Sequence, residues 1–495
     1  MRQDLSVPSD LRLGERPTPA PASDPPSVAS ACPAEPTILP AGSATAGDLW
    51  PTPLPAYTYL GGPAGSGKTF LTRAWAETDP SVLLCATTGI AAINLGGSTI
   101  NSQLGYFDTK SLQDMHVSGF LSARLGKLYK IGIRRIVLDE ASMLDGDQLT
   151  LLVQGIEELS GRGYTLQRDT GESEPPAMGL TLVGDFAQLS PVKAPFAFES
   201  SEWRQTDQNQ APRFAEATHR LTDIRRQTDR DFVEALHAAR VGDGRKVAEY
   251  FNAHGGFQAT SDDRFEGPTI LAKNVAVEKY NWIRLDKVAG AQVIFPSDRW
   301  GQQRSEWGNP LKPPHTWGIP PRLNLKIGAL VMVLANRRAE GPPPQPYIYV
   351  NGDLGTLIDA NVEQRVAYVQ LQRTGETVAV DYVRREVKIP CDAPRRKELR
   401  DTGQEQLISE DGRWEITGWI DYMPVRLAYA STVHKSQGLS LDRVQVNIRD
   451  GFFKEPGMCY VALSRARTSQ GLRLVGTPAS LIERCTVNPK LKEWL

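Results

Sequence analysis

The residues best suited to chemistry form a glycine-rich segment near the start of the chain. Its members are Gly62, Pro63, Ala64, Gly65, Ser66, Gly67, Lys68 and Thr69. A short apolar run over 57–61 precedes the segment and a helix-like stretch follows it, which is the context of a phosphate-binding loop. Glycines let successive backbone N–H groups point at one anion, and a helix N-terminus adds favourable partial charge. The segment therefore predicts nucleotide binding; the alternative is a chance glycine-rich turn.

Four polar side chains are placed to assist a triphosphate. Lys68 is expected to neutralise the β- and γ-phosphates, and the Thr69 hydroxyl is expected to ligate Mg²⁺. Downstream, a buried strand over 135–138 ends in Asp139 and Glu140. Asp139 would hold Mg²⁺ directly or through water, and Glu140 would polarise the attacking water. The alternative for this pair is two acids that cap the following helix.

A third buried strand, over 180–183, leads into a polar turn that contains Gln188. In a parallel α/β sheet, ligands bind at the edge formed by the carboxyl ends of the strands. Gln188 is therefore expected to sense the γ-phosphate or to orient the attacking water. The alternative is a glutamine with a structural role only.

Two arginines far along the chain are expected to complete the site. Arg226 and Arg465 both lie beyond a domain boundary expected near residue 205. An arginine from a second domain stabilises the transferring phosphoryl group only when the domains close, which links the nucleotide state to domain motion. The alternative is that Arg225 and Arg226 only form salt bridges on a helix surface, where such pairs contribute little to stability.

Short polar side chains follow several of the predicted strands and suit a nucleic-acid backbone. Phosphate oxygens accept hydrogen bonds from hydroxyls, backbone N–H groups and lysine. His434 either stacks on a base or orders its loop. The candidate contacts are Thr87, Thr88, Ser102, Thr432, His434, Lys435 and Ser436.

The whole chain must position these groups, and its composition narrows the choices. Its 495 residues are enough for two to four domains. Lys and Arg number 56 against 57 Asp and Glu, so any nucleic-acid binding must depend on local charge. The five cysteines are scattered without a paired spacing, which argues against a zinc site and favours a reducing, cytoplasmic compartment. No apolar run is long enough to span a membrane.

Two regions differ from the α/β texture of the rest. Residues 1–55 are rich in Pro, Ala, Ser and Thr, which predicts a disordered tail that binds a protein partner or none. Its acids and its lack of an apolar core argue against a targeting signal. Residues 305–420 contain an Asn351-Gly352 turn signal and alternating runs over 366–372 and 377–383, which predict a small β-barrel insert.

Taken in order, the motifs resemble those of superfamily 1B DNA helicases, with the Pif-type and Dda/RecD-like members most similar. The phosphate loop and the segments 86–102, 138–144 and 184–192 resemble motifs I, Ia, II and III. The segments 221–242, 269–281, 428–441 and 460–467 resemble the later motifs, and the resemblance covers 57–476. It implies that Arg226 contacts the γ-phosphate and that Arg465 is the arginine finger.

The resemblance also implies an architecture, with two RecA-like α/β domains built on parallel sheets. The first would cover 56–204, and the second would comprise 205–304 and 421–495 around an SH3-like barrel over 305–420 that covers single-stranded DNA. A wedge that separates DNA strands would lie within 105–131. Phe107, Met115 and Phe120 are its candidates.

The implied activity is ATP- and Mg²⁺-dependent translocation on single-stranded DNA with unwinding of forked duplexes, in the 5′→3′ direction, by a monomeric motor. A RecD-like motor subunit, an RNA helicase and a protein-binding P-loop switch remain alternatives. Two positions depart from the family pattern. No glutamine that reads adenine precedes the loop, so ATP is implied by the resemblance only, and Asn101 stands where a histidine is common.

Overall fold

The computed structural model describes residues 55–161, 178–204, 214, 218–261, 265–301, 319–340, 347–449, 453–491 and 495. The expected disordered tail lies outside the described residues apart from Pro55. Within the described part of the chain, no helix has both the length and the apolar character needed to cross a membrane.

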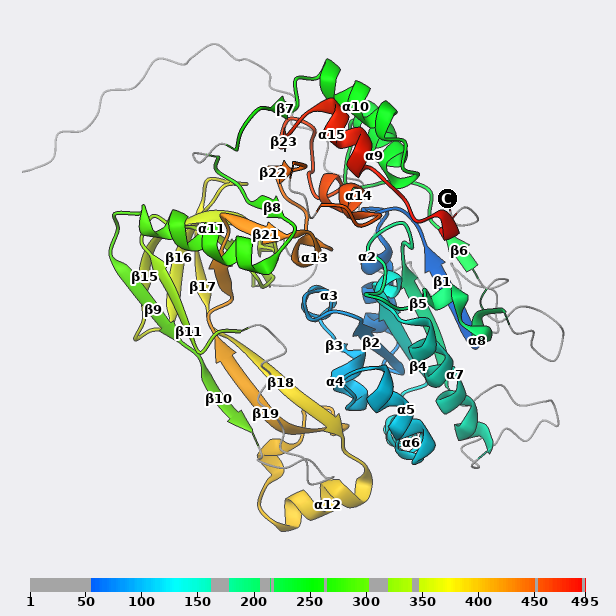
Figure 1. The fold of residues 1–495 in the computed structure, drawn as a ribbon. Helices are drawn as coiled ribbons and strands as arrows, with labels where there is room; N and C mark the ends of the chain where they lie inside the picture. Colours follow the sequence, from blue (N-terminus) through cyan, green and yellow to red (C-terminus); the bar gives the residue numbers. More distant parts are fainter. Residues whose placement is uncertain are drawn as a thin grey trace, which may run out of the picture. The chain divides into compact units, whose positions relative to one another are not determined.

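The first sheet has six strands in the order β3-β2-β4-β5-β1-β6, and every neighbouring pair is parallel (Figure 1). The strands are β1 (Tyr57–Gly61), β2 (Val82–Ala86), β3 (Ser98–Thr99), β4 (Arg135–Asp139), β5 (Gly179–Gly184) and β6 (Thr218–Arg220). All residues of β1, β4 and β5 are buried, as expected for a parallel sheet covered on both faces. The strands predicted from the apolar runs are confirmed.

The strand β6 corrects the expected domain boundary. It lies beyond residue 205, yet it pairs with β1 and extends the first sheet to Arg220. The backbone N–H of Leu221 then donates to the carbonyl of Gly61, 2.8 Å away. The first sheet therefore ends about 15 residues later than expected, because three residues are enough for an edge strand.

Helices connect the strands of the first sheet. They are α2 (Lys68–Thr78), α3 (Gly89–Leu95), α4 (Ile100–Leu104), α5 (Thr109–Val117), α6 (Phe120–Lys130), α7 (Gly146–Gly161) and α8 (Ser201–Arg204). The expected wedge region consists of α5, α6 and their flanking turns. Met115 packs against the core of the first sheet, whereas Phe107 is 80% exposed and Phe120 is 44% exposed.

A second parallel sheet has the order β21-β8-β22-β23-β7 (Figure 1). Its strands are β7 (Phe257–Gln258), β8 (Thr269–Leu271), β21 (Ala430–Thr432), β22 (Val444–Asn447) and β23 (Leu472–Val475). Its helices are α9 (Arg230–Arg240), α10 (Gly244–Ala253), α11 (Asn274–Asp286), α13 (Val433–Ser436), α14 (Met458–Leu463) and α15 (Pro478–Arg484). The two parallel sheets with their helices confirm the predicted α/β class.

Antiparallel strands separate the two parts of the second sheet in sequence. A five-stranded sheet contains β12 (Leu330–Val333), β15 (Leu354–Asn361), β16 (Val366–Leu371), β17 (Thr377–Asp381) and β20 (Val425–Leu427). Smaller sheets contain β9 (Gln292–Pro296), β10 (Asp298–Gly301), β11 (Arg322–Lys326), β13 (Arg337–Arg338), β14 (Tyr347–Tyr349), β18 (Val383–Pro390) and β19 (Trp414–Tyr422), and α12 (Ala393–Asp401) follows β18. These strands run from 292 to 427, so they exceed the expected 305–420 at both ends.

Aromatic rings fill the core behind the turn that follows β5. The ring of Phe186 lies 5.0 Å from that of Tyr59, 4.9 Å from that of Phe198 and 5.7 Å from that of Trp203. Because Phe186 directly follows Asp185 and precedes Gln188 by two residues, this packing fixes the turn that presents both polar side chains.

We expect Phe186→Ala to lower the free energy of unfolding by about 3–5 kcal/mol, because the cavity would be lined by rings that cannot collapse into it. Urea unfolding followed by tryptophan fluorescence would measure the change, since Trp203 contacts Phe186. Phe107→Ala is the matched control, because Phe107 is 80% exposed and its loss should leave the midpoint unchanged. Equal midpoints for both variants would contradict a stabilising role for the aromatic cluster.

Candidate phosphate-binding site

The glycine-rich segment forms a tight loop between β1 and α2. Gly62, Gly65 and Gly67 have φ values of 155°, 83° and 96°, which L side chains rarely adopt. At Gly65 a Cβ atom would lie 2.7 Å from the Cβ atom of Arg226, so the neighbouring chain also excludes a side chain. The helix begins at Lys68, which leaves the N-terminal N–H groups facing the loop.

Lys68 folds over the loop that it closes. Its Nζ donates to the carbonyls of Gly62 and Pro63 at 2.8 and 2.9 Å. Burial lowers the pKa of Lys68, while the nearby carboxylates of Asp185, Glu140 and Asp139 raise it. Phosphate oxygens would replace two backbone carbonyls as acceptors for this ammonium group, which suits the predicted role.

Thr69 and Asp139 lie together, as the sequence predicts. The Thr69 hydroxyl donates to Asp139 Oδ2 at 2.9 Å. Burial raises the pKa of Asp139, so a cation at this carboxylate would offset a large desolvation cost. A hydroxyl and one carboxylate fit Mg²⁺, which takes few protein ligands and completes its shell with phosphates and water.

Glu140 occupies an unusual backbone conformation beside Asp139. Its φ of 57° is left-handed, and its N–H donates to Asp139 Oδ1 at 2.8 Å. Burial and, next, the charge of Asp139 raise the pKa of Glu140 to about 7. The Thr87 hydroxyl donates to the carbonyl of Glu140 at 2.8 Å, so this candidate DNA contact instead holds the strained turn.

Gln188 lies at the same site, where its side chain is hydrogen-bonded to that of Gln437. Gln437, which sequence reasoning did not select, donates from Nε2 to Glu140 Oε2 at 2.9 Å and to Gln188 Oε1 at 3.2 Å. Gln437 directly follows the candidate contacts in α13, and its position next to them in the sequence was the available signal.

The two predicted arginines lie near each other, and Arg226 also contacts the loop. The backbone N–H of Arg226 donates to the carbonyl of Gly65 at 3.2 Å, and its Nη1 donates to the carbonyl of Ser464 at 2.9 Å. Burial and, next, the charge of Arg465 lower the pKa of Arg226 to about 9. Arg465 is fully buried, and its Nη1 donates to the carbonyls of Ser436 and Leu439 at 3.4 and 3.3 Å. Its guanidinium is therefore held by its own half of the molecule.

A buried polar chain joins the loop to the second sheet, and sequence reasoning missed it. The N–H of Ala64 donates to the Tyr460 hydroxyl at 2.7 Å, and that hydroxyl donates to Asp185 Oδ2 at 2.9 Å. Arg240 of α9 donates to Asp185 Oδ1 through Nη2 at 3.0 Å. Asp185 lies in the motif segment 184–192 and Tyr460 in the motif segment 460–467. Nothing in the residue types or the spacing of these segments indicates that the two side chains meet.

The candidate DNA contacts divide by exposure. Ser102 and Lys435 are exposed, and Thr88 and His434 are partly exposed. Thr432 and Ser436 are buried, and their hydroxyls bond within the loop: Thr432 accepts from the Lys435 N–H, and Ser436 donates to the Val433 carbonyl. Thr432 and Ser436 therefore shape α13, and their side chains do not face the solvent as a direct contact requires.

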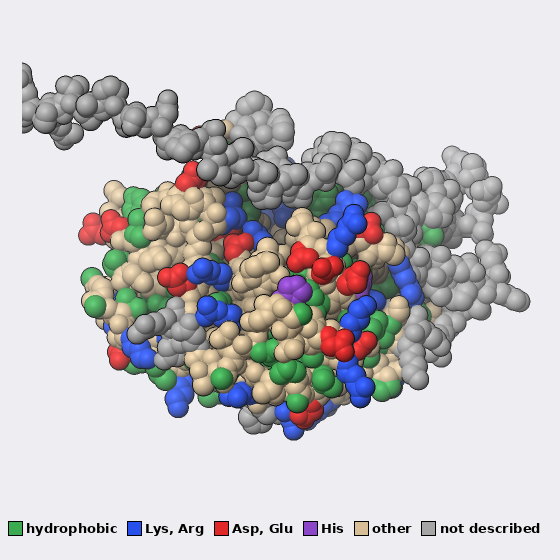
Figure 2. Space-filling model, turned by 90° about the horizontal axis from the view of Figure 1, so that it is seen from above, with side chains coloured by type: hydrophobic (Ala, Val, Ile, Leu, Met, Phe, Trp, Pro, Cys, Tyr) green, Lys and Arg blue, Asp and Glu red, His purple; other side chains and the backbone are tan. Residues whose placement is uncertain are grey.

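Charge of neither sign dominates the face of the molecule drawn in Figure 2. Figure 2 shows basic and acidic side chains interspersed over the face that it draws, as the near-equal counts of the two suggest. Among the described residues, no group of three or more His, Cys, Asp or Glu side chains is arranged to hold a metal ion.

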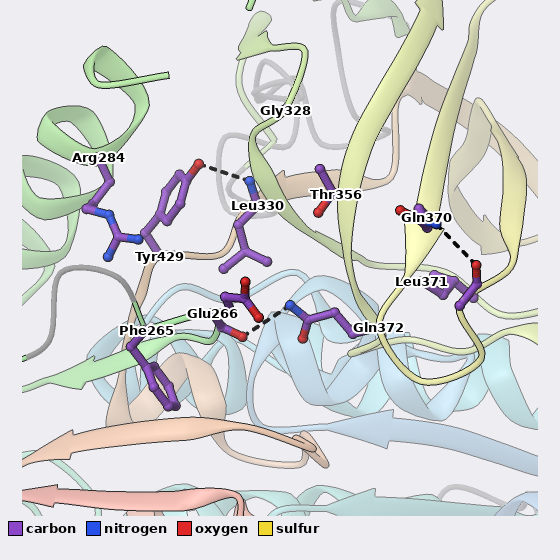
Figure 3. Close-up of a pocket in the computed structure, with 11 residues that line it drawn as sticks. Phe265, Glu266, Arg284, Gly328, Leu330, Thr356, Gln370, Leu371, Gln372 and Tyr429 are labelled. Atoms are coloured by element: carbon purple, nitrogen blue, oxygen red, sulfur yellow. Dashed lines mark hydrogen bonds between the residues drawn. The ribbon is translucent and has the colours of Figure 1, made fainter. Parts of the chain in front are cut away.

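A separate pocket of about 460 Å³ lies between the five-stranded antiparallel sheet and elements of the second parallel sheet (Figure 3). Arg284 of α11 packs over the Tyr429 ring, 4.7 Å from its centroid, and the Tyr429 hydroxyl accepts from the Leu330 N–H at 3.0 Å. On another side, Gln372 Nε2 donates to the Glu266 carbonyl at 3.1 Å. None of the predicted site residues lines this pocket.

Comparisons with known proteins agree with the arrangement of these motifs. Residues 53–246 match the model of the PIF1-like helicase family. The ATP-dependent DNA helicase Pif1 of Bdellovibrio bacteriovorus is 30% identical over 445 residues, which cover 88% of this chain and 86% of that protein. Human ATP-dependent DNA helicase PIF1 is 27% identical, over 84% of this chain and 58% of the human protein.

Solved structures show the same fold. The crystal structure of Pif1 helicase from Candida albicans has a TM-score of 0.56 at 25% identity and covers 89% of this chain and 95% of its own. Bacteroides sp. Pif1 in complex with ADP-AlF4 has a TM-score of 0.62 at 23% identity, over 88% of this chain and 92% of its own. The motifs, the fold and the extent of the sequence match agree, and the chain belongs to the PIF1-like helicase family.

Proposed function

We propose that this chain is an ATP-dependent DNA helicase that moves along single-stranded DNA and unwinds forked duplexes. The observation that supports this function most directly is the polar chain from Ala64 through Tyr460 to Asp185. It joins the phosphate-binding loop to the turn after β5, both at the first sheet, through Tyr460 of α14, a helix of the second sheet. A change at the nucleotide therefore acts on the contact between the two halves, as a motor requires.

The chemistry follows from the residues at the loop. Lys68 binds the β- and γ-phosphates, and Thr69 and Asp139 would hold Mg²⁺, which would supply positive charge against that of the phosphates. Glu140 orients the attacking water and accepts its proton, and Gln188 positions the same water. Arg226 and Arg465 stabilise the charge that develops on the transferring phosphoryl group.

Contacts with the DNA strand come from two elements that follow strands of different sheets. Thr88 and Ser102 lie after β2 and β3, and Lys435 and His434 lie in α13 after β21. Closing and reopening of the two halves would move these two sets of contacts relative to each other. Alternating grip then converts hydrolysis into steps. The 5′→3′ direction, action as a monomer and cover of the strand by the antiparallel insert are carried over from the family resemblance.

The first prediction from the proposed function concerns nucleotide hydrolysis. We expect steady-state ATP hydrolysis to rise strongly with a single-stranded DNA oligonucleotide, and Lys68→Ala to lower kcat by about 10²–10³-fold, because one preorganised charge is lost. Equal hydrolysis with and without DNA would favour the protein-binding switch. Stimulation by RNA alone would indicate that the protein moves along RNA and not along DNA.

The second prediction concerns the arginine at the loop. We expect Arg226→Ala to lower the DNA-stimulated kcat by about 10³-fold or more, while binding of a fluorescent ATP analogue changes little. The adjacent Arg225→Ala is the control, because Arg225 is exposed and should be dispensable. Similar losses in both variants would show a general effect of the segment and not an action on the phosphate.

The third prediction separates unwinding from translocation. Phe107 is the most exposed of the three wedge candidates, so we propose that it stacks against the first base pair of the duplex. Phe107→Ala should slow unwinding of a forked duplex at least about fivefold, since a base–aromatic stack is worth about 1–3 kcal/mol. Hydrolysis stimulated by single-stranded DNA should be unchanged. Normal unwinding would exclude Phe107 as the wedge.

A further inference from the structure

Gln437 connects the two water-handling side chains of the candidate site. It is 5% exposed, and its single Nε2 donates to both Glu140 and Gln188. Its own Oε1 is buried and has no hydrogen-bond partner among the described residues. A buried amide that leaves its acceptor unsatisfied is costly, so the position of Gln437 reflects the two bonds that it donates.

The backbone that precedes Gln437 belongs to the proposed DNA contact. Lys435, two residues earlier, is exposed, and its N–H is bound by the Thr432 hydroxyl that caps α13. Arg465 donates to the carbonyls of Ser436 and Leu439, which flank Gln437. Movement of α13 would therefore move Gln437 together with the guanidinium of Arg465.

The following residue places this loop against the first half of the molecule. Gly438 has a φ of 79°, and a Cβ atom there would lie 2.9 Å from Asn94 Nδ2 of α3. Asn94 Oδ1 in turn accepts from Asn351 Nδ2, in the turn before β15. The loop thus touches α3, which begins beside Thr88, and a strand bound across Thr88 and Lys435 would press on both sides of this contact.

The bonds that Gln437 makes oppose hydrolysis. A carboxylate that activates water must direct a free lone pair at that water, within hydrogen-bond reach. The N–H of Gln437 takes one oxygen of Glu140, and it also takes the side-chain oxygen of Gln188. One carboxylate oxygen of Glu140 and the side-chain oxygen of Gln188 are therefore directed at an amide in place of water.

We propose that Gln437 is the positioning residue that makes hydrolysis depend on DNA. Without DNA it holds Glu140 and Gln188 in an unproductive orientation, and DNA bound at α13 withdraws it. This inference rests on the proposed function and identifies how the same site is regulated. Gln437 acts through Glu140 and Gln188, without contact to the nucleotide.

The test is Gln437→Leu, which keeps the volume and removes the donor. We expect ATP hydrolysis without DNA to rise roughly tenfold, because a hydrogen bond to a charged group is lost. The ratio of rates with and without DNA should fall toward one, while the affinity for a fluorescent single-stranded oligonucleotide stays at the wild-type value. Gln437→Asn, whose amide is one methylene short of Glu140, should show the same pattern.

The matched control is Gln445→Leu in β22. Gln445 is also a buried glutamine, and it donates to the Thr269 hydroxyl away from the candidate site. The Gln445→Leu variant should keep the wild-type ratio of hydrolysis rates with and without DNA. A DNA-free rate in Gln437→Leu that is unchanged or lower would overturn the inference, because Gln437 would then assist catalysis. A wild-type protein indifferent to DNA would overturn the proposed function itself, and the inference with it.

Discussion

Buried carboxylates at one edge of the first sheet impose the constraint on which the rest of the structure depends. Asp139 and Asp185 are almost completely enclosed, and Glu140 accepts a hydrogen bond from Gln437 of the second half. Ionised groups in such a site need cations or donors close by. Lys68 supplies one charge locally, but Arg240 supplies another from the opposite half. The two halves are therefore held together by the electrostatic needs of the nucleotide site.

The same edge also contains positive charge that the protein alone does not balance. Arg226 is partly buried and Arg465 is fully buried; burial lowers the pKa of both, and the charge of Arg465 lowers that of Arg226 further. A triphosphate carries the charge that would relieve this repulsion. Because Arg226 lies on the loop side and Arg465 is held by carbonyls of the second half, a nucleotide would favour an arrangement in which both reach it.

Local patterns predicted most of the first half. The apolar runs predicted its buried strands. The glycine-rich segment predicted the surroundings of Lys68, because the conformation of glycine and the start of a helix are local properties. Pairings across the two halves were not predictable, because Tyr460 meets Asp185 over 275 positions and no pattern in either segment encodes the partner. The edge strand β6 was missed for another reason: three residues give too short a run for periodicity to detect.

The near-neutral charge of the chain bears on how a motor of this kind holds its track. Where a protein binds a phosphate backbone through an excess of basic charge, affinity depends little on conformation, because counterion release occurs in every state. Here the exposed candidates are single hydroxyls and one lysine at the ends of strands from two sheets. Such contacts are strong only when the elements are correctly spaced. If these candidates bind the strand, a change in spacing between the halves would alter both sets of contacts, and a translocating protein needs such a change to release the strand at each step.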